Sequence, residues 1–145
     1  QIVRHRRFSV QEFSQRYANP RARGDMFEYA ECRLQDTQNR QNSIQTENVM
    51  LHQEWTEMQD KVIDACREAY EWAIENNIAK EQARKILPEG LTKTRLYMNG
   101  TIRSWIHYID LRGANGTQLE HMQIAHACAD AIAKIFPNIT NYTAE

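Results

Sequence analysis

Residues 46–77 carry the pattern that most constrains what this chain can fold into. Apolar side chains recur there at steps of three and four residues, the period of one face of an α-helix. They are Trp55, Met58, Val62, Cys66, Ala69 and Ala73. Asn76 and Asn77 end the pattern. The sequence therefore predicts one long amphipathic helix, against which the rest of the chain must build its core.

The remaining elements are expected to be short. A helix from Lys80 to Leu87 should stop at Pro88, because proline cannot continue a helix. Strands are predicted at Phe27–Leu34 and, after a turn at Gly90, at Thr92–Met98. Two further helices follow, the first marked by Ile102, Trp105, Ile106 and Ile109, and the second by Leu119, Met122, Ala129, Ile132 and Phe136, before Pro137 and a frayed tail.

The apolar content is low for a chain that would fold alone. A length of 145 residues predicts one domain, residues 1–145. Its apolar share is about 40% when Gly is counted in place of Tyr, against roughly 45–50% in typical domains. Such a thin core favours completion by other chains. No apolar run is long enough to span a bilayer, and the three cysteines lack disulfide spacing, so we expect a protein of the cytoplasm without membrane contacts.

Arginine dominates the basic residues near the N-terminus. The formal net charge is −1, which gives no general attraction to nucleic acid or to anionic membranes. Yet 13 of the 18 basic residues are Arg, and eight of these fall in the first 40 residues, where there is no Lys. The planar guanidinium grips phosphate or carboxylate through two hydrogen bonds. The bias predicts anion recognition, with a basic disordered arm as the alternative.

Other kinds of site have weaker support. A hydrolase would pair Ser14 with His5 and Glu12, but no glycine-rich elbow surrounds the serine. A metal site would use His121, His126 and Cys128, but on one helix the last two point about 160° apart. Neither standard phosphate-binding glycine loop is present. We therefore expect no metal.

Three blocks of sequence resemble one family. Arg4-His5-Arg6, followed after seven residues by Ser14-Gln15-Arg16-Tyr17, resembles the signature of the flavin-dependent thymidylate synthases. Residues 81–88 (Glu-Gln-Ala-Arg-Lys-Ile-Leu-Pro) and the stretch from Arg103 through His107 to Arg112 resemble two further family segments, and Thr117-Gln118-x-Glu120 also fits. The likeness runs from Gln1 to about Phe136, nearly the whole chain.

The resemblance implies a fold and a reaction. The fold would be a mainly helical α+β domain with a small antiparallel sheet, lacking the N-terminal portion that relatives have. The reaction would methylate deoxyuridine monophosphate (dUMP) to thymidylate (dTMP), with methylenetetrahydrofolate as carbon donor and the hydride passing from NADPH through FAD. Relatives of this kind are homotetramers with active sites between subunits, so the same assembly is expected here.

The resemblance also assigns residues to roles. Arg112 is the expected catalytic residue, because a guanidinium facing uracil N3 stabilises its deprotonated form and makes C5 nucleophilic. The expected flavin contacts are Arg4, His5, Arg6, Glu12, Thr101, Arg103 and His107. The expected nucleotide contacts are Gln1, Arg4, Ser14, Gln15, Arg16, Arg84 and Arg112, with Arg16 and Arg84 on the phosphate. Gln11 and Thr101 stand where relatives often have Asn.

This route needs no protein nucleophile. Cys66 and Cys128 fall on apolar-patterned helices and Cys32 lacks a paired base, so all three are expected to be small buried hydrophobes. Two rivals remain open. One is a non-catalytic nucleotide- or RNA-binding module that uses residues 1–23, and the other is a pure interaction protein.

Overall fold

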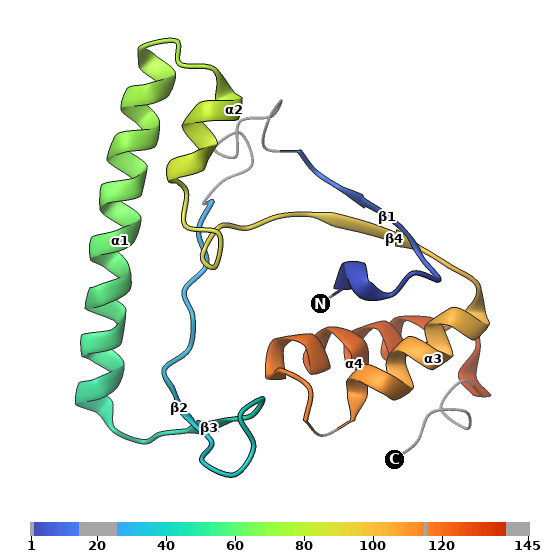
Figure 1. The fold of residues 1–145 in the computed structure, drawn as a ribbon. Helices are drawn as coiled ribbons and strands as arrows, with labels where there is room; N and C mark the ends of the chain where they lie inside the picture. The colour runs from blue at the N-terminus through green and yellow to red at the C-terminus, as the bar shows by residue number, and fades with distance from the viewer. Residues whose placement is uncertain (1, 15–25, 115, 139–145) are drawn as a thin grey trace. The chain divides into compact units, whose positions relative to one another are not determined.

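The computed structural model describes residues 2–14, 26–114 and 116–138 (Figure 1). These residues fall into two compact units. Unit 1 comprises residues 1–10, 33–45 and 97–145, and unit 2 comprises residues 11–32 and 46–96. Strands β1 (Ser9–Glu12) and β4 (Leu96–Asn99) form one two-stranded sheet, and β2 (Arg33–Gln35) and β3 (Ser43–Gln45) form another. Both sheets are antiparallel, as expected, and helices predominate.

Unit 2 is built on the predicted long helix, α1 (Val49–Glu75). The Asn48 side chain accepts the Leu51 N–H at 3.1 Å and so caps its first turn. The helix packs against α2 (Lys80–Ala83) and η3 (Arg84–Ile86). The core of this unit consists of Met26, Phe27, Ile63, Tyr70, Ala73, Ala83 and Leu87.

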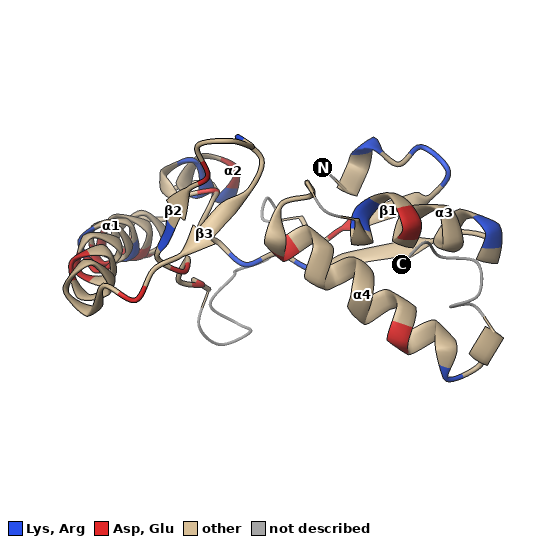
Figure 2. Ribbon diagram, turned by 90° about the horizontal axis from the view of Figure 1, so that it is seen from below, with Lys and Arg blue, Asp and Glu red and all other residues tan. Residues whose placement is uncertain are grey.

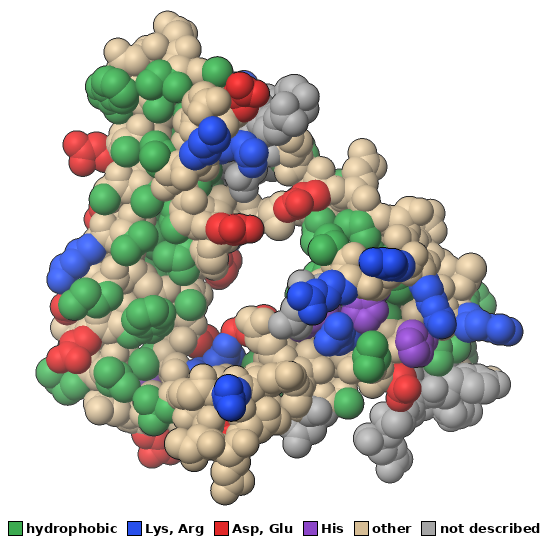
Figure 3. Space-filling view, in the orientation of Figure 1, with side chains coloured by type: hydrophobic (Ala, Val, Ile, Leu, Met, Phe, Trp, Pro, Cys, Tyr) green, Lys and Arg blue, Asp and Glu red, His purple; other side chains and the backbone are tan. Residues whose placement is uncertain are grey.

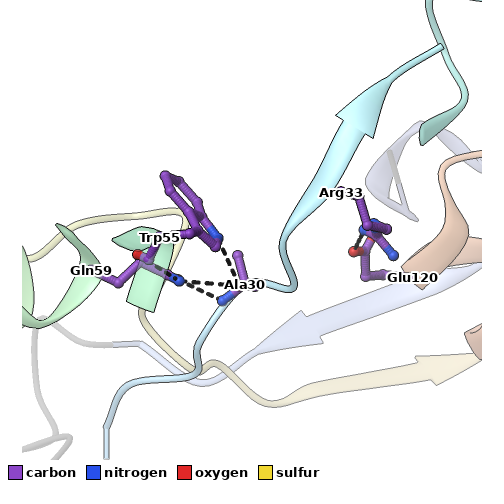
Figure 4. A network of polar contacts seen from close by, with 5 residues as sticks. All are labelled: Ala30, Arg33, Trp55, Gln59 and Glu120. Carbon is purple, nitrogen blue, oxygen red and sulfur yellow. Dashed lines mark hydrogen bonds and ion pairs between the residues drawn. The ribbon is translucent and has the colours of Figure 1, made fainter. Parts of the chain in front are cut away.

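The buried face of α1 follows the predicted stripe only in part: Ala73 is buried and Cys66 packs against the core, but the N-terminal half of the stripe does not. Trp55, Met58 and Val62 are 41%, 54% and 45% exposed, whereas Gln59 is buried. Its side chain accepts the Ala30 N–H at 2.7 Å and donates to the Ala30 carbonyl at 3.1 Å (Figure 4). The Trp55 indole donates to the same carbonyl at 2.9 Å. A polar residue is buried here because it pairs with otherwise unpaired backbone.

That pairing also explains why Phe27–Leu34 does not form the one continuous strand that the sequence predicts. Only Phe27, which forms a bridge with Thr92, and residues from Arg33 onward take part in sheet pairing. Between them the Ala30 backbone bonds to side chains of α1 instead of a neighbouring strand. The predicted strand Thr92–Met98 likewise contracts to Leu96–Asn99, and β1 and β3 were not predicted.

Two predicted helices are shorter than expected. The segment Lys80–Leu87 changes from α-helix to 3₁₀-helix at Arg84, and Leu87 is extended with a ψ of 134°. This follows from Pro88, because a residue before proline is forced out of the helical region. The last helix, α4 (Leu119–Ala133), ends three residues before Phe136.

Unit 1 pairs α3 (Ile102–Gly113) with α4 (Figure 1). Its core is Tyr108, Ile109 and Ala125, with Phe8, Met98 and Trp105 packed at the edge. The Phe8 and Trp105 rings meet edge to face at 4.7 Å. Among the described residues, no helix has the length and apolar character needed to cross a bilayer. The single-domain expectation remains a prediction beside this division into two units.

Candidate functional site

His5, the centre of the Arg-His-Arg motif, lies against α3 in unit 1. It follows the short helix η1 (Ile2–Arg4), and its backbone N–H bonds to the Ile2 carbonyl at 3.1 Å. The imidazole meets the Tyr108 ring edge to face at 5.0 Å. Arg112 Nε donates to His5 Nε2 at 2.9 Å. Since Nε2 accepts this bond, the imidazole is neutral with its proton on Nδ1.

Electrostatics keep His5 neutral. Burial lowers the pKa of His5, and the electrostatic effects of Arg112 and His107 lower it further. A protonated imidazole would lose its acceptor atom and repel the guanidinium. The pair therefore holds only while His5 is uncharged, and it fixes the orientation of Arg112 on the last turn of α3.

A buried pair lies behind His5. The Tyr108 hydroxyl and His121 Nε2 share a hydrogen bond at 3.0 Å, and both side chains are buried. Burial raises the pKa of Tyr108 to about 12, aided by the Cys128 thiol and opposed by Arg112. Burial, with Arg112 and His5, also lowers the pKa of His121. His121 has two interpretations from the sequence, a metal ligand or, preferred, a buried or surface side chain. In the structure it is buried and forms a hydrogen bond with Tyr108, whose ring contacts His5.

Arg112, the partner of His5, is one of the residues that line a cationic cavity. The cavity has a volume of about 420 Å³, and its lining side chains are Arg4, Arg40, Gln41, Arg112, Thr117 and Gln118. The structure thus places Arg4 and Arg112, two of the predicted site residues, in the lining of one cavity. Arg40 and Gln41 were not predicted, and the only sequence signal for them was the Arg bias of the first 40 residues. Basic residues lie along the N-terminal segment and on α3 (Figure 2), and the space-filling view shows a group of basic side chains (Figure 3).

A second cavity of unit 1, also about 420 Å³, contains Arg6 and Thr101. Its other lining residues are Arg7, Phe8, Ser9, Asn99 and Gly100. A Cβ at Gly100 would lie 2.5 Å from the Phe8 ring, so only glycine allows this approach. Thr101 accepts the Ser104 N–H at 3.2 Å and caps α3. Arg103 and His107 lie one turn apart on α3 outside both linings, so neither cavity gathers them.

Unit 2 gathers three other predicted residues around a cavity of about 630 Å³. Glu12, Ser14 and Arg84 line it, with Phe13, Lys85, Leu87, Glu89, Thr92 and Thr94. The Thr94 hydroxyl donates to Glu12 Oε1 at 2.7 Å. Buried Ala83 and Leu87 anchor the helix that carries Arg84. The cations and hydroxyls suit a phosphate. Gln1, Gln15 and Arg16 lie outside the described residues.

The alternative sites find no support in this geometry. Among residues 2–14, 26–114 and 116–138, no three His, Cys, Asp or Glu side chains gather as metal ligands. His5 Nε2 accepts a hydrogen bond from Arg112, so this nitrogen is not available as the base that the hydrolase alternative assigned to His5. Burial raises the pKa of the Cys128 thiol, so this thiol is a poor nucleophile.

Comparison with known proteins agrees with the motifs. The family described as thymidylate synthase complementing protein matches residues 1–138. A probable flavin-dependent thymidylate synthase of Paramecium bursaria Chlorella virus 1 is 48% identical over 96% of this chain and 62% of its own length. The flavin-dependent thymidylate synthase of Synechocystis is 44% identical over the same shares. The chain therefore spans about 62% of the length of these relatives.

A solved structure has the same fold. The UMP/dUMP methylase PolB from Streptomyces cacaoi, crystallised with 5-Br UMP, superposes with a TM-score of 0.71 at 24% identity. The match covers 92% of this chain and 62% of that chain. At this level of identity the likeness concerns the fold alone.

Proposed function

Because this chain belongs to the thymidylate synthase complementing protein family, we propose that it carries the active-site residues of a flavin-dependent thymidylate synthase. Its substrate is dUMP, which it methylates at C5. Methylenetetrahydrofolate provides the carbon. The single observation that carries the proposal is Arg112, held by His5 at a cavity lined by cations.

Arg112 is the proposed catalytic residue. Its Nε donates to His5, and Arg112 is one of the residues that line the cavity. A fixed positive charge facing uracil N3 and its neighbouring carbonyl stabilises the deprotonated ring, and the delocalised electrons make C5 nucleophilic. The bond to neutral His5 holds this charge in place, so little reorganisation is needed. No protein thiol takes part.

The nucleotide phosphate belongs to Ser14, Arg16 and Arg84 in this proposal. Ser14 and Arg84 line one cavity, where a hydroxyl and a guanidinium are suitable phosphate donors. Glu12 lines the same cavity and is held by Thr94, so it orients polar groups there or contacts the flavin. Gln1, Gln15 and Arg4 complete the proposed set of nucleotide contacts.

FAD fits the donor chemistry of unit 1. A dinucleotide with two linked phosphates needs cations and polar groups. Arg4 lines one cavity of unit 1, and Arg6 and Thr101 line the other. In this proposal Arg103 and His107 on α3 complete the set of flavin contacts with His5. His5 Nδ1–H remains a donor toward a ligand. When bound, FAD supplies the hydride that originates from NADPH.

The proposal includes a homotetramer in the cytoplasm. On α1 the side chains of Trp55, Met58, Val62 and Trp72 are exposed in the single chain, which favours burial against further copies. The three cysteines are free, in keeping with a reducing compartment.

Flavin binding tests the proposal. The purified chain should take up FAD and turn yellow, and dUMP should change the flavin absorbance. Deoxyuridine, which lacks the phosphate, should change it much less. A colourless protein that takes up no FAD and oxidises no NADPH in the presence of dUMP would leave an RNA- or nucleotide-binding module as the better account.

A further inference from the structure

The loop between β2 and β3, residues 36–42, carries two residues of the cationic cavity that lie outside every motif used above. Arg40 and Gln41 line that cavity together with Arg4 and Arg112. All four belong to unit 1, so the arrangement lies within one compact part of the chain.

The loop is held in shape by side-chain bonds to backbone. The Asp36 carboxylate accepts the N–H groups of Gln38 and Asn39 at 2.8 and 3.1 Å, and these bonds lower the pKa of Asp36. Asn39 Oδ1 accepts the Gln41 N–H at 3.1 Å. Gln35 Nε2 lies within 3.3 Å of the Arg40 carbonyl oxygen. The backbone of Arg40 is therefore held in a defined position, although its side chain is exposed.

The hairpin is also tied to α4. Arg33 on β2 forms an ion pair with Glu120 in the first turn of α4 (Figure 4). Burial alone would raise the pKa of Glu120, but its bond to backbone and the bond and charge of Arg33 hold it below the usual value. Thr117 and Gln118, directly before that turn, line the cavity. The ion pair thus fixes the loop with respect to the cavity wall.

The cavity gathers three positive charges and no carboxylate. Within the part of the chain that the structure describes, Arg4, Arg40 and Arg112 form no ion pair, and Arg112 bonds only to neutral His5. Guanidinium groups repel one another, so their gathering without an acid favours an anion between them. At about 420 Å³ the space falls within the roughly 300–1,000 Å³ typical of small-molecule sites, so the anion is one group of a larger ligand.

We propose that Arg40 and Gln41 are ligand contacts, and that with Arg4, in the cavity that Arg112 also lines, they form a subsite for a phosphate or carboxylate group of a ligand of the reaction. The identity of that ligand rests on the proposed function, whereas the binding of an anion does not. Arg40 provides the paired donors, and Gln41 provides an amide that can donate to the same group.

Phosphate titration followed by NMR tests the subsite without flavin or nucleotide. The backbone amide signal of Gln41 should shift as inorganic phosphate is added at constant ionic strength, and its concentration dependence gives a local dissociation constant. Arg40→Ala should raise this constant about 3- to 30-fold, the range for losing one charge-assisted hydrogen bond at a partly exposed site. Arg40→Lys should fall between the two.

Lys134→Ala is the matched control, because it removes one positive charge from the same unit at an exposed position at the end of α4. It should change the constant less than about twofold, as expected for distant screened charges. An unresponsive Gln41 signal, or equal constants for the wild type and Arg40→Ala, would overturn the proposal, whatever the flavin experiment gives.

Substitutions of Asp36 distinguish two effects on phosphate binding, the position of Arg40 and the net charge of the chain. Asp36→Ala makes the chain more positive, so charge alone predicts tighter phosphate binding. Loss of the two backbone bonds predicts weaker binding, which is our expectation. Asp36→Asn, which keeps an acceptor oxygen but no charge, should restore binding. Tighter binding in Asp36→Ala would refute a role for the loop in positioning Arg40.

Competing probes identify the kind of ligand. If acetate shifts the Gln41 signal less than phosphate does, and both effects depend on Arg40, the bound group is a phosphate. Two paired titrations, dUMP against deoxyuridine and FMN against riboflavin, then show which ligand carries that phosphate. If acetate shifts Gln41 as strongly as phosphate, the group is a carboxylate, as found on folates. Either result supports the subsite, and shifts that do not depend on Arg40 contradict it.

Discussion

The cavities of the two units differ in the charges that line them. The cavity of unit 1 that holds Arg112 is lined by three arginines and neutral polar groups, while that of unit 2 mixes Arg84 and Lys85 with Glu12 and Glu89. Uncompensated charge suits a group that must stabilise negative charge developing on a ring. Balanced charge suits binding of a phosphate that carries the same charge throughout. We therefore expect the cavity of unit 1 to govern the rate of the reaction and that of unit 2 to govern the affinity for the nucleotide.

Replacement of Arg112 should have the largest effect, and it tests whether the cavity of unit 1 governs the rate. Arg112→Ala should lower kcat for thymidylate formation by about 10²–10³-fold, the usual cost of removing one group that stabilises charge in the transition state. Arg112→Lys should recover part of the loss, because it keeps the charge but not the bond from Nε to His5. Steady-state kinetics with dUMP measure both. A change confined to KM would place Arg112 in simple binding.

The next effect belongs to unit 2. Arg84→Ala should raise the dissociation constant of dUMP by about 10- to 100-fold, because a charged hydrogen bond to phosphate is worth about 1.5–3 kcal/mol. The dissociation constant of deoxyuridine should hardly change. Calorimetric titration of the two ligands makes the comparison. Equal losses for both ligands would remove Arg84 from the phosphate site.

A smaller effect concerns the support of His5. Tyr108→Phe removes the hydroxyl bonded to His121 in a buried setting, and should lower the free energy of unfolding by about 1–3 kcal/mol. Tyr97→Phe is the control, because that tyrosine is 60% exposed and should have almost no effect. Urea denaturation measures both. Equal stabilities would show that the pair does not stabilise unit 1.

The smallest expected effect is a dependence of the free energy of unfolding on pH. The folded state lowers the pKa values of His5 and His121 below 6.5, so the unfolded chain binds more protons at these sites. Their stabilising contribution is therefore fully present above about pH 6.5 and is lost as the pH falls through the folded values. Urea denaturation between pH 5 and 8 should show this fall. His121→Gln should reduce it, and an unchanged slope would assign it to other groups.

Sequence predicted the elements better than the faces they bury. The period of residues 46–77 predicts α1, but it cannot reveal that Gln59 is buried, because its partner is the Ala30 backbone far away in the sequence. The hairpin strands of three residues each are too short for a period to be recognised. Motifs indicated Arg4 and Arg112, which share a cavity. The motifs could not indicate Arg40. It lines the same cavity as Arg4 and Arg112 because hydrogen bonds of Asp36 shape its loop and the ion pair of Arg33 ties the hairpin to α4.

Thymidylate formation tests the central claim most directly. The chain is incubated with FAD, dUMP, NADPH and methylenetetrahydrofolate, and the nucleotide products are separated by chromatography. We expect dTMP to form only when all four compounds are present, and its amount to fall sharply in Arg112→Ala. The absence of dTMP from a protein that binds FAD and dUMP, or undiminished dTMP from Arg112→Ala, would contradict the claim.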